Sequence, residues 1–377
     1  MAVFIVCEFD PFHYGHEYLI SEARRLFPGH TVVCVMSGNF VQRGNPALYD
    51  EYARARCAIE GGADIVLSLP FPWCTASAER FASGAVSVAD GLWREGDALL
   101  FGSECGDAER LASAASVLSS PEFDRLLGER IRKTREPYAK ARQALFADAE
   151  LLSSRNDVLG IEYVKALRKL RPGAVFVPVK RTDHESSTAI RESGNIFPHL
   201  PTYCRNILRS AGDPSDIRFA GHALLSHLRE EPYRLAADGE NGLTGRLSRA
   251  AEGAGNITET FSAAASPQFT NARIRRAALY SYLKVSKREL CARPLFTQLF
   301  AANGAGISYL SKTKKTRSIA VITKPSHTSS LTQAAMAQYE LQRRADRLYC
   351  LCFARAREAS YFMKTSPYIK KGGSSGE

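Results

Sequence analysis

Two histidines and a glycine stand together near the start of the chain, in the stretch "CEFDPFHYGHEYLI" at residues 7–20. His13 and His16 lie three positions apart, so both imidazoles can face one ligand on an incoming helical turn. Each imidazole can donate hydrogen bonds to phosphate oxygens, and Gly15 lets a phosphate approach the backbone. The pattern favours a phosphate-binding turn, and the alternative is an ordinary turn into a helix with two incidental histidines.

A second group of phosphate-binding side chains occurs in "ESSTAIRES", residues 185–193. The hydroxyls of Ser186, Ser187 and Thr188 can cap a helix or donate to phosphates. Arg191 can pair with a phosphate through two parallel hydrogen bonds. Alone, this motif is more often a plain helix cap. Together with the histidine turn it indicates a second anion site at the far end of the same sheet.

Short apolar runs alternate with helical patterns through the first half of the chain and must position these residues. Strands are expected at residues 2–9, 31–37, 63–70, 97–104 and 174–181. Strands that alternate with helices predict βαβ units, hence a parallel sheet with helices on both faces. Ligands bind such sheets beyond the carboxyl ends of the strands, where both motifs fall. Helix N-termini at that edge also favour an anion.

The second half of the chain reads as short helices in series, with one convincing late strand in "RSIAVITKP" at residues 317–325. A length of 377 residues indicates at least two domains. We therefore expect an α/β domain over residues 1–198. A mainly helical domain should follow over residues 199–377, ending in a flexible tail "KKGGSSGE".

The net charge of +11 is unevenly distributed. Residues 1–198 carry a net charge of −3 and residues 199–377 a net charge of +14. This asymmetry predicts that the second half binds a polyanion such as RNA, unless it is simply an arginine-rich solvated surface. Tyr280 and Tyr282 lie among these charges but are expected in the core. The predicted RNA-binding cations are Arg273, Arg275, Arg276, Lys284, Lys287 and Arg288, and a second basic cluster occupies residues 311–317.

Composition argues against several other classes of protein. No apolar run reaches the roughly 18 residues that span a bilayer, and the first residues lack the basic start of a signal peptide. The nine cysteines are scattered, without the paired spacing of a zinc site. We expect a cytoplasmic protein with no dedicated metal site.

The combination of HxGH with SSTxIR resembles the nucleotidyltransferase superfamily, whose members act at the α-phosphate of ATP. Longer stretches, "EFDPFHYGH", "VMSGNFVQRGNPALYD", "LPFPWCTASAERFASGAV", "FGSECGD" and "NDVLGIEYVKAL", resemble the bacterial tRNA(Met) cytidine acetate ligase family. The resemblance covers nearly the whole chain. It implies a Rossmann-like nucleotidyltransferase domain followed by a basic, helical, tRNA-binding domain.

This resemblance implies a two-step reaction of ATP, acetate and tRNA(Met), with Mg²⁺ accompanying the ATP. Acetate would form acetyl-adenylate, and the wobble cytidine of elongator tRNA(Met) would then take the acetyl group. His13 and His16 would stabilise charge at the phosphates and are the expected catalytic residues. The expected ATP-binding residues are Cys7, Glu8, Phe9, Asp10, Pro11, Phe12, His13, Tyr14, Gly15, His16, Glu17, Tyr18, Leu19, Ile20, Gly102, Asn156 and Arg181, to which the second motif adds Ser187 and Arg191. The alternatives are an adenylyltransferase acting on a small metabolite and a non-catalytic nucleotide- or RNA-binding relative.

Several positions near the expected site leave alternatives open. Asp10 stands where the family usually has Asn, and it either recruits Mg²⁺, caps the turn or alters ligand preference. Cys7 stands where Ala is common, and His184 is the candidate replacement for a Tyr-His pair in a longer family loop. For the neighbouring loop, Ser37, Asn39, Gln42 and Arg43 are expected to close over the adenylate, although Arg43 is as well suited to an ion pair with Asp50. Asp157 is expected to cap its helix.

Overall fold

The computed structural model describes residues 1–182 and 185–371 of the chain. His184, the candidate replacement for a family Tyr-His pair, lies outside the described residues. Residues 372–377, which form most of the tail expected to be flexible, lie outside them as well.

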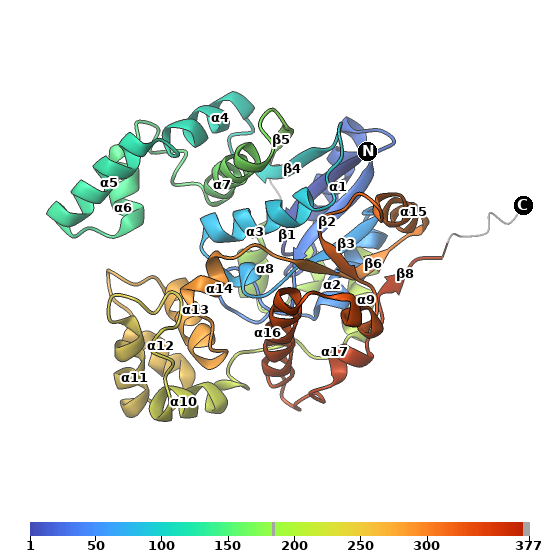
Figure 1. Ribbon diagram of the computed structural model, residues 1–377. Coiled ribbons are helices and arrows are strands. Elements are labelled where there is room, and N and C mark those ends of the chain that lie inside the picture. Colours follow the sequence, from blue (N-terminus) through green and yellow to red (C-terminus); the bar gives the residue numbers. More distant parts are fainter. Residues whose placement is uncertain (183–184, 372–377) are drawn as a thin grey trace, which may run out of the picture.

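One sheet of eight described strands forms the centre of the molecule, in the order β5-β4-β1-β2-β3-β6-β7, with β8 paired to β6 (Figure 1). The first five strands are parallel neighbours, as the sequence predicts. The Rossmann-like prediction for the first half is therefore confirmed. The strands are β1 (Ala2–Cys7), β2 (Thr31–Ser37), β3 (Ile65–Leu69), β4 (Ala98–Ser103), β5 (Val175–Lys180), β6 (Phe296–Ala302), β7 (Ala320–Ile322) and β8 (Tyr368–Ile369).

The second half of the chain contributes three strands to this sheet, of which the sequence predicts only β7. Strand β6 pairs antiparallel with β3, placing Ile65 opposite Ala302, and β8 pairs with β6. The seven residues of β6, FTQLFAA, do not alternate polar and apolar side chains, so periodicity alone does not mark them as a strand. The sheet thus draws on both halves of the chain, and a domain boundary at residue 198 stays a prediction.

Helices cover both faces of the sheet because its strands alternate their side chains between two cores. Phe4 and Val33 enter one core, and their neighbours Ile5 and Cys34 enter the other. The helices of the first half are α1 (Tyr14–Leu26), α2 (Glu51–Glu60), α3 (Ala78–Asp90), α4 (Ala108–Val117), α5 (Pro121–Thr134), α6 (Tyr138–Leu145), α7 (Arg155–Leu170) and α8 (Ser187–Glu192), with a 3₁₀ turn η1 (Trp73–Thr75).

Helices predominate after residue 198, as predicted. They are α9 (Thr202–Ser210), α10 (Gly221–Glu230), α11 (Leu243–Gly253), α12 (Ile257–Ala264), α13 (Asn271–Tyr282), α14 (Lys287–Cys291), α15 (Gly304–Thr313), α16 (Gln333–Cys350) and α17 (Tyr361–Lys364), with 3₁₀ turns η2 (Phe197–His199) and η3 (Pro325–Ser330). None of the described helices is long and apolar enough to cross a membrane.

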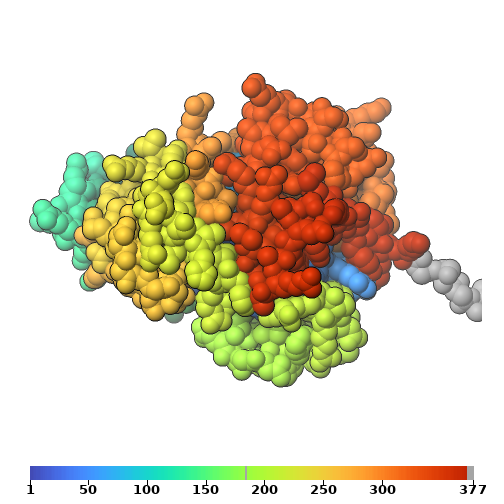
Figure 2. Space-filling model, turned by 90° about the horizontal axis from the view of Figure 1, so that it is seen from below, coloured from blue at the N-terminus to red at the C-terminus, as the bar shows by residue number. Residues whose placement is uncertain are grey.

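Two groups of helices stand out from the sheet on the same side of the molecule (Figure 1). One is the hairpin of α5 and α6, which we call the α5–α6 arm. The other is the bundle of α10 to α14, and the view from below in Figure 2 again shows both groups on one side. Helix α15 lies near the opposite edge of the sheet in Figure 1.

Candidate active site

A cavity of about 620 Å³ opens at the carboxyl ends of β1, β4 and β5, where the sequence places the nucleotide. Its wall comes from the turn after β1, the loop between β2 and α2, the ends of β4 and β5, the start of α7 and helix α8. The residues that line it include both predicted histidines, Gly102, Asn156, Arg181, Ser187 and Arg191. The structure therefore brings the two motifs predicted to bind phosphate, 174 residues apart, into one cavity.

The two histidines stack at the start of α1, with ring centroids 3.7 Å apart. Nδ1 of His13 accepts the Gly15 N–H at 3.1 Å, and Nδ1 of His16 accepts the His13 N–H at 3.3 Å. Because each Nδ1 acts as an acceptor, the neutral rings carry their protons on Nε2. The Nε2–H of His13 then donates to Ser187 Oγ at 3.0 Å. Both histidines are fixed as Nε2–H donors.

Burial sets the charge of His16. The apolar surroundings lower the pKa of His16 well below its usual value, and the neighbouring His13 and Arg181 lower it further. The ring is therefore neutral at physiological pH. A neutral donor can stabilise the negative charge that develops on a phosphate oxygen in the transition state. A permanently charged donor would also bind the ground-state substrate tightly, and such uniform binding does not accelerate the reaction.

Helix α8 supplies the second phosphate-binding motif, and Ser186 caps it by accepting the Ala189 N–H at 3.2 Å. Arg191, one turn further along, reaches back to the turn after β1. Its Nη1 donates to the carbonyl of Asp10 and lies 3.2 Å from the Asp10 carboxylate. The second carboxylate oxygen of Asp10 accepts the Leu48 N–H at 2.6 Å. The structure thus gives Asp10 a role outside the three alternatives, as a brace between Arg191 and the loop after β2.

Buried charged groups also hold the loop between β2 and α2 against the β1 turn. Glu8 accepts the Gln42 N–H at 2.6 Å, and burial raises the pKa of Glu8. Arg54, which is fully buried, donates to the carbonyls of Tyr49 at 2.8 Å, Glu8 at 2.5 Å and Gly38. One guanidinium therefore joins the ends of β1 and β2 beside the cavity.

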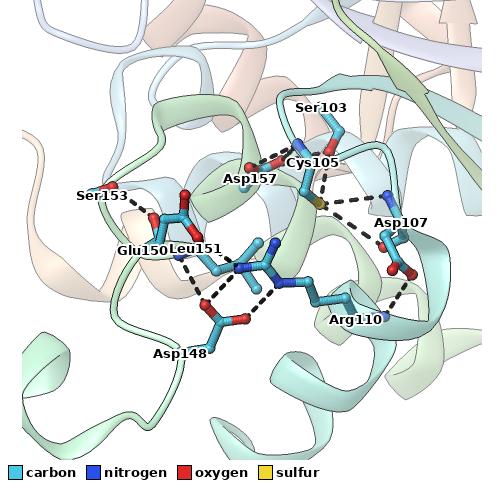
Figure 3. A network of polar contacts seen from close by, with 9 residues as sticks. All are labelled: Ser103, Cys105, Asp107, Arg110, Asp148, Glu150, Leu151, Ser153 and Asp157. Carbon is cyan, nitrogen blue, oxygen red and sulfur yellow. Dashed lines mark hydrogen bonds and ion pairs between the residues drawn. The ribbon is translucent and has the colours of Figure 1, made fainter.

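The loop after β4 is braced from α7 by Asp157 (Figure 3). Its carboxylate accepts the Ser103 hydroxyl at 2.5 Å and the N–H groups of Glu104 and Cys105 at 3.0 and 3.2 Å. Ser154, rather than Asp157, caps α7 by accepting the Asp157 N–H. This corrects the expected capping role of Asp157, which instead fixes the cavity rim next to Gly102.

The rim carries several cations suited to phosphates. Arg43, Arg155, Lys180, Arg181 and Arg191 all line the cavity. Burial, followed by the nearby Arg155, lowers the pKa of Arg43. This concentration of positive charge complements the negative charge of a polyphosphate chain. Among the described residues no group of three or more His, Cys, Asp or Glu side chains is placed to hold a metal ion.

The structure does not bring every predicted residue to the cavity. Pro11, Phe12, Tyr14, Glu17 and Ile20 lie outside its lining, and Glu17 instead accepts the Tyr203 hydroxyl at 2.8 Å. In the loop after β2, Gln42 and Arg43 line the cavity as expected. Ser37 and Asn39 are buried away from it, with Asn39 donating to Asp346 at 3.0 Å. Asp50 pairs with Arg357 at 2.9 Å rather than with Arg43.

Several lining residues were not predicted from the sequence. Phe81, Phe101, Leu159 and Tyr163 form an apolar part of the wall, and residues 215–217 close it from the segment between α9 and α10. The apolar residues look like ordinary core positions in the sequence. Segment 215–217 carries no motif, since only the fold brings it beside Leu48.

The predicted RNA-binding cations divide into buried and exposed groups. Arg276 is buried and pairs with Asp238 at 2.5 Å, so it has a structural role rather than the predicted surface role. Arg273 donates to the carbonyls of Asp238 and Glu240, and Arg275 donates to the carbonyl of Arg43 at 3.1 Å. The exposed cations of the set are Lys284, Lys287 and Arg288. Tyr280 is buried, in agreement with the expected core position.

Comparison with known proteins defines first the class and then the family. A sequence model described as HIGH Nucleotidyl Transferase matches residues 1–362. A tRNA(Met) cytidine acetate ligase of Caldanaerobacter subterraneus subsp. tengcongensis is 32% identical over 86% of this chain and 88% of that protein. One from Acetivibrio thermocellus is 30% identical over 93% and 94%.

Solved structures agree with this assignment. The crystal structure of Thermotoga maritima TmcAL bound with alpha-thio ATP superposes with a TM-score of 0.91 at 28% identity, covering 99% of this chain and 100% of that one. Its apo form gives a TM-score of 0.90 at 27% identity over the same shares. The chain belongs to the HIGH nucleotidyl transferase family and, within it, to the tRNA(Met) cytidine acetate ligases.

Proposed function

We propose that this protein activates acetate with ATP and acetylates a cytidine of tRNA(Met). The single observation that supports this most strongly is the joining of His13, His16 and Ser187 in one cation-rimmed cavity. An acetate oxygen attacks the α-phosphorus, the bond to the bridging oxygen breaks, and pyrophosphate leaves. The cytidine amine then attacks the acetyl carbon, loses a proton, and AMP departs.

Each part of the chain has a place in this proposal. The Nε2–H groups of the two histidines stabilise the charge that develops on the phosphate oxygens, and Arg43, Arg181 and Arg191 neutralise the pyrophosphate. Mg²⁺ enters with ATP rather than at a protein site. The wobble cytidine of elongator tRNA(Met) is the proposed acceptor, bound by the basic second half, and the cytoplasm is the proposed location because the tRNA acts there.

The test uses the whole chain with ATP, labelled acetate, labelled pyrophosphate and total tRNA. We expect acetate-dependent exchange of pyrophosphate into ATP without tRNA, and labelled acetylcytidine in tRNA(Met) when tRNA is added. His13→Ala should abolish exchange, because it removes both a donor and the cap of α1. Exchange that proceeds with another small acid but not acetate would refute the substrate. Exchange without any labelled tRNA would favour an adenylyltransferase acting on a small metabolite.

A further inference from the structure

The α5–α6 arm carries an excess of positive charge that the first half of the chain, as a whole, does not show. Residues 130–140 contain five cations and one carboxylate, although residues 1–198 together have a net charge of −3. Arg130 pairs with that carboxylate, Glu136, at 2.9 Å. Averaging over the half chain hides this local excess.

The other four cations of residues 130–140 point into solvent. Arg132, Lys133, Arg135 and Lys140 are exposed, and none makes an ion pair among the described residues. Tyr138, the first residue of α6, is 59% exposed and lies between two of these cations in sequence. Exposed arginine and lysine side chains with an open aromatic ring fit phosphates and an unpaired base, which is the chemistry of RNA rather than of a neutral partner.

The arm is a firmly attached extension of the cavity wall. Phe123 and Leu127 of α5 are buried in the core. Arg142 of α6 pairs with Glu162 of α7 at 2.8 Å, with side chains only 11% and 3% exposed. Arg110 of α4 holds Asp148, in the segment between α6 and α7, at 2.6 Å (Figure 3). Helix α7 itself begins with Arg155 and Asn156 in the cavity lining.

The bundle of α10 to α14 borders the cavity from another segment. Helix α13 contacts the loop after β2 through Arg275, which donates to the carbonyl of the cavity residue Arg43. The arm and the bundle lie on the same side of the molecule (Figures 1 and 2). When one nucleotide of a macromolecule enters the cavity, the rest of that macromolecule therefore meets basic protein surface both beside α7 and beside α13.

We propose that the α5–α6 arm is a second RNA-contact surface, whose exposed cations bind phosphates of the substrate tRNA and whose Tyr138 stacks on an unpaired base. This inference rests on the proposed function for the identity of the RNA. It adds a surface from the first half of the chain to the basic second half that the sequence predicts.

Another exposed basic cluster provides a matched control. Lys312, Lys314 and Lys315 are exposed at the end of α15. Helix α15 begins after Asn303, which donates to Asp64 at 2.7 Å just before β3 starts. The sequence groups this cluster with the predicted RNA-binding cations, but it lies at the amino ends of the parallel strands, opposite the cavity. RNA that is bound at the cavity is therefore not expected to reach it, and Figure 1 shows α15 far from the arm.

The experiment compares two triple variants of the full chain. One replaces Arg132, Lys133 and Arg135 with Gln, and the other replaces Lys312, Lys314 and Lys315 with Gln. Binding of tRNA is measured by filter retention over a series of salt concentrations, and acetate-dependent ATP–pyrophosphate exchange is measured without tRNA. Each phosphate contact contributes about 0.7 to 0.9 to the slope of log affinity against log salt, the range from single strands to B-form duplexes.

We expect the arm variant to bind tRNA at least about tenfold more weakly at 0.1 M salt and to lose about 2 to 3 from the salt slope. Its exchange activity should be that of the wild type, and the α15 variant should match the wild type in both assays. Tyr138→Ala should weaken binding without changing the slope.

Equal tRNA binding and equal slopes for the two triple variants would overturn the inference, leaving the arm as a solvated helix face or a contact for another polyanion. If the wild type shows no ATP–pyrophosphate exchange, the proposed function is refuted, but the comparison of tRNA binding between the variants can still be interpreted. A wild-type chain that does not bind tRNA would refute both.

Discussion

Replacing Arg54 should show that a single buried guanidinium positions the two loops beside the proposed phosphate site. Arg54 is fully buried and donates to backbone carbonyls after β1 and after β2, as well as to Tyr49. Arg54→Met keeps most of the volume but leaves three buried carbonyls without this donor. Each buried group left unsatisfied costs about 1 to 3 kcal/mol.

These costs are not additive, because the three carbonyls share one donor and can relax together. We expect the free energy of unfolding to fall by about 3 to 5 kcal/mol, the lower part of the sum of three such costs. That is a large part of the roughly 5 to 15 kcal/mol that stabilises a folded chain. Arg54→Lys keeps the charge but not the planar fork, and it should fall between Met and wild type.

The assay combines urea unfolding, followed by circular dichroism, with calorimetric titration of alpha-thio ATP at low temperature. Arg54→Lys should bind the nucleotide at least about tenfold more weakly, a loss of about 1.4 kcal/mol. Arg229→Met is the control, because Arg229 donates to the carbonyls of Ala251 and Ala254 in the bundle, away from the cavity. It should lower stability without changing nucleotide affinity. If Arg54→Lys has the same urea midpoint and the same nucleotide affinity as the wild type, the reasoning is refuted.

Three further outcomes follow from the site. Ser187→Ala removes the acceptor of the His13 Nε2–H, so exchange should slow about tenfold with less than about 1 kcal/mol lost in stability, and an unchanged rate would contradict the positioning role. Because the pKa of His16 is lowered on folding, the unfolded chain binds more protons, and stability should fall as pH drops below about 6.5. The pKa values of Glu8 and Asp346 are raised on folding, that of Asp346 to about 6, and these two groups make stability rise as the pH drops. The measurement is therefore the difference in urea midpoint between wild type and His16→Gln, followed from pH 7 to 5. Asp10→Asn removes a carboxylate that lines the proposed phosphate site and should tighten ATP binding a few-fold, whereas a lost Mg²⁺ requirement would show that Asp10 holds the metal.

The sequence predicts the part of the site that depends on local patterns. The five parallel strands follow from apolar runs separated by helical periodicity, and the sheet edge then brings His13 and Ser187 together. Arg54 could not be predicted, because in "EYARARCAIE" it has the spacing of a surface charge. Only the convergence of three carbonyls from distant segments makes its burial possible. Strand β6 was not predicted because its residues show no strand periodicity and its partner β3 is far away in sequence.

The pairing of β6 with β3 has a consequence for how the protein is made. Thr297 bonds to Ser68 across 229 residues of chain, which a ribosome adds in roughly 10 to 45 s at common rates of synthesis. Throughout that interval the outer edge of β3 has no partner strand. An open, apolar strand edge is a template for pairing with other chains. Until β6 has been synthesised, the growing chain therefore carries an open strand edge that can pair with other chains.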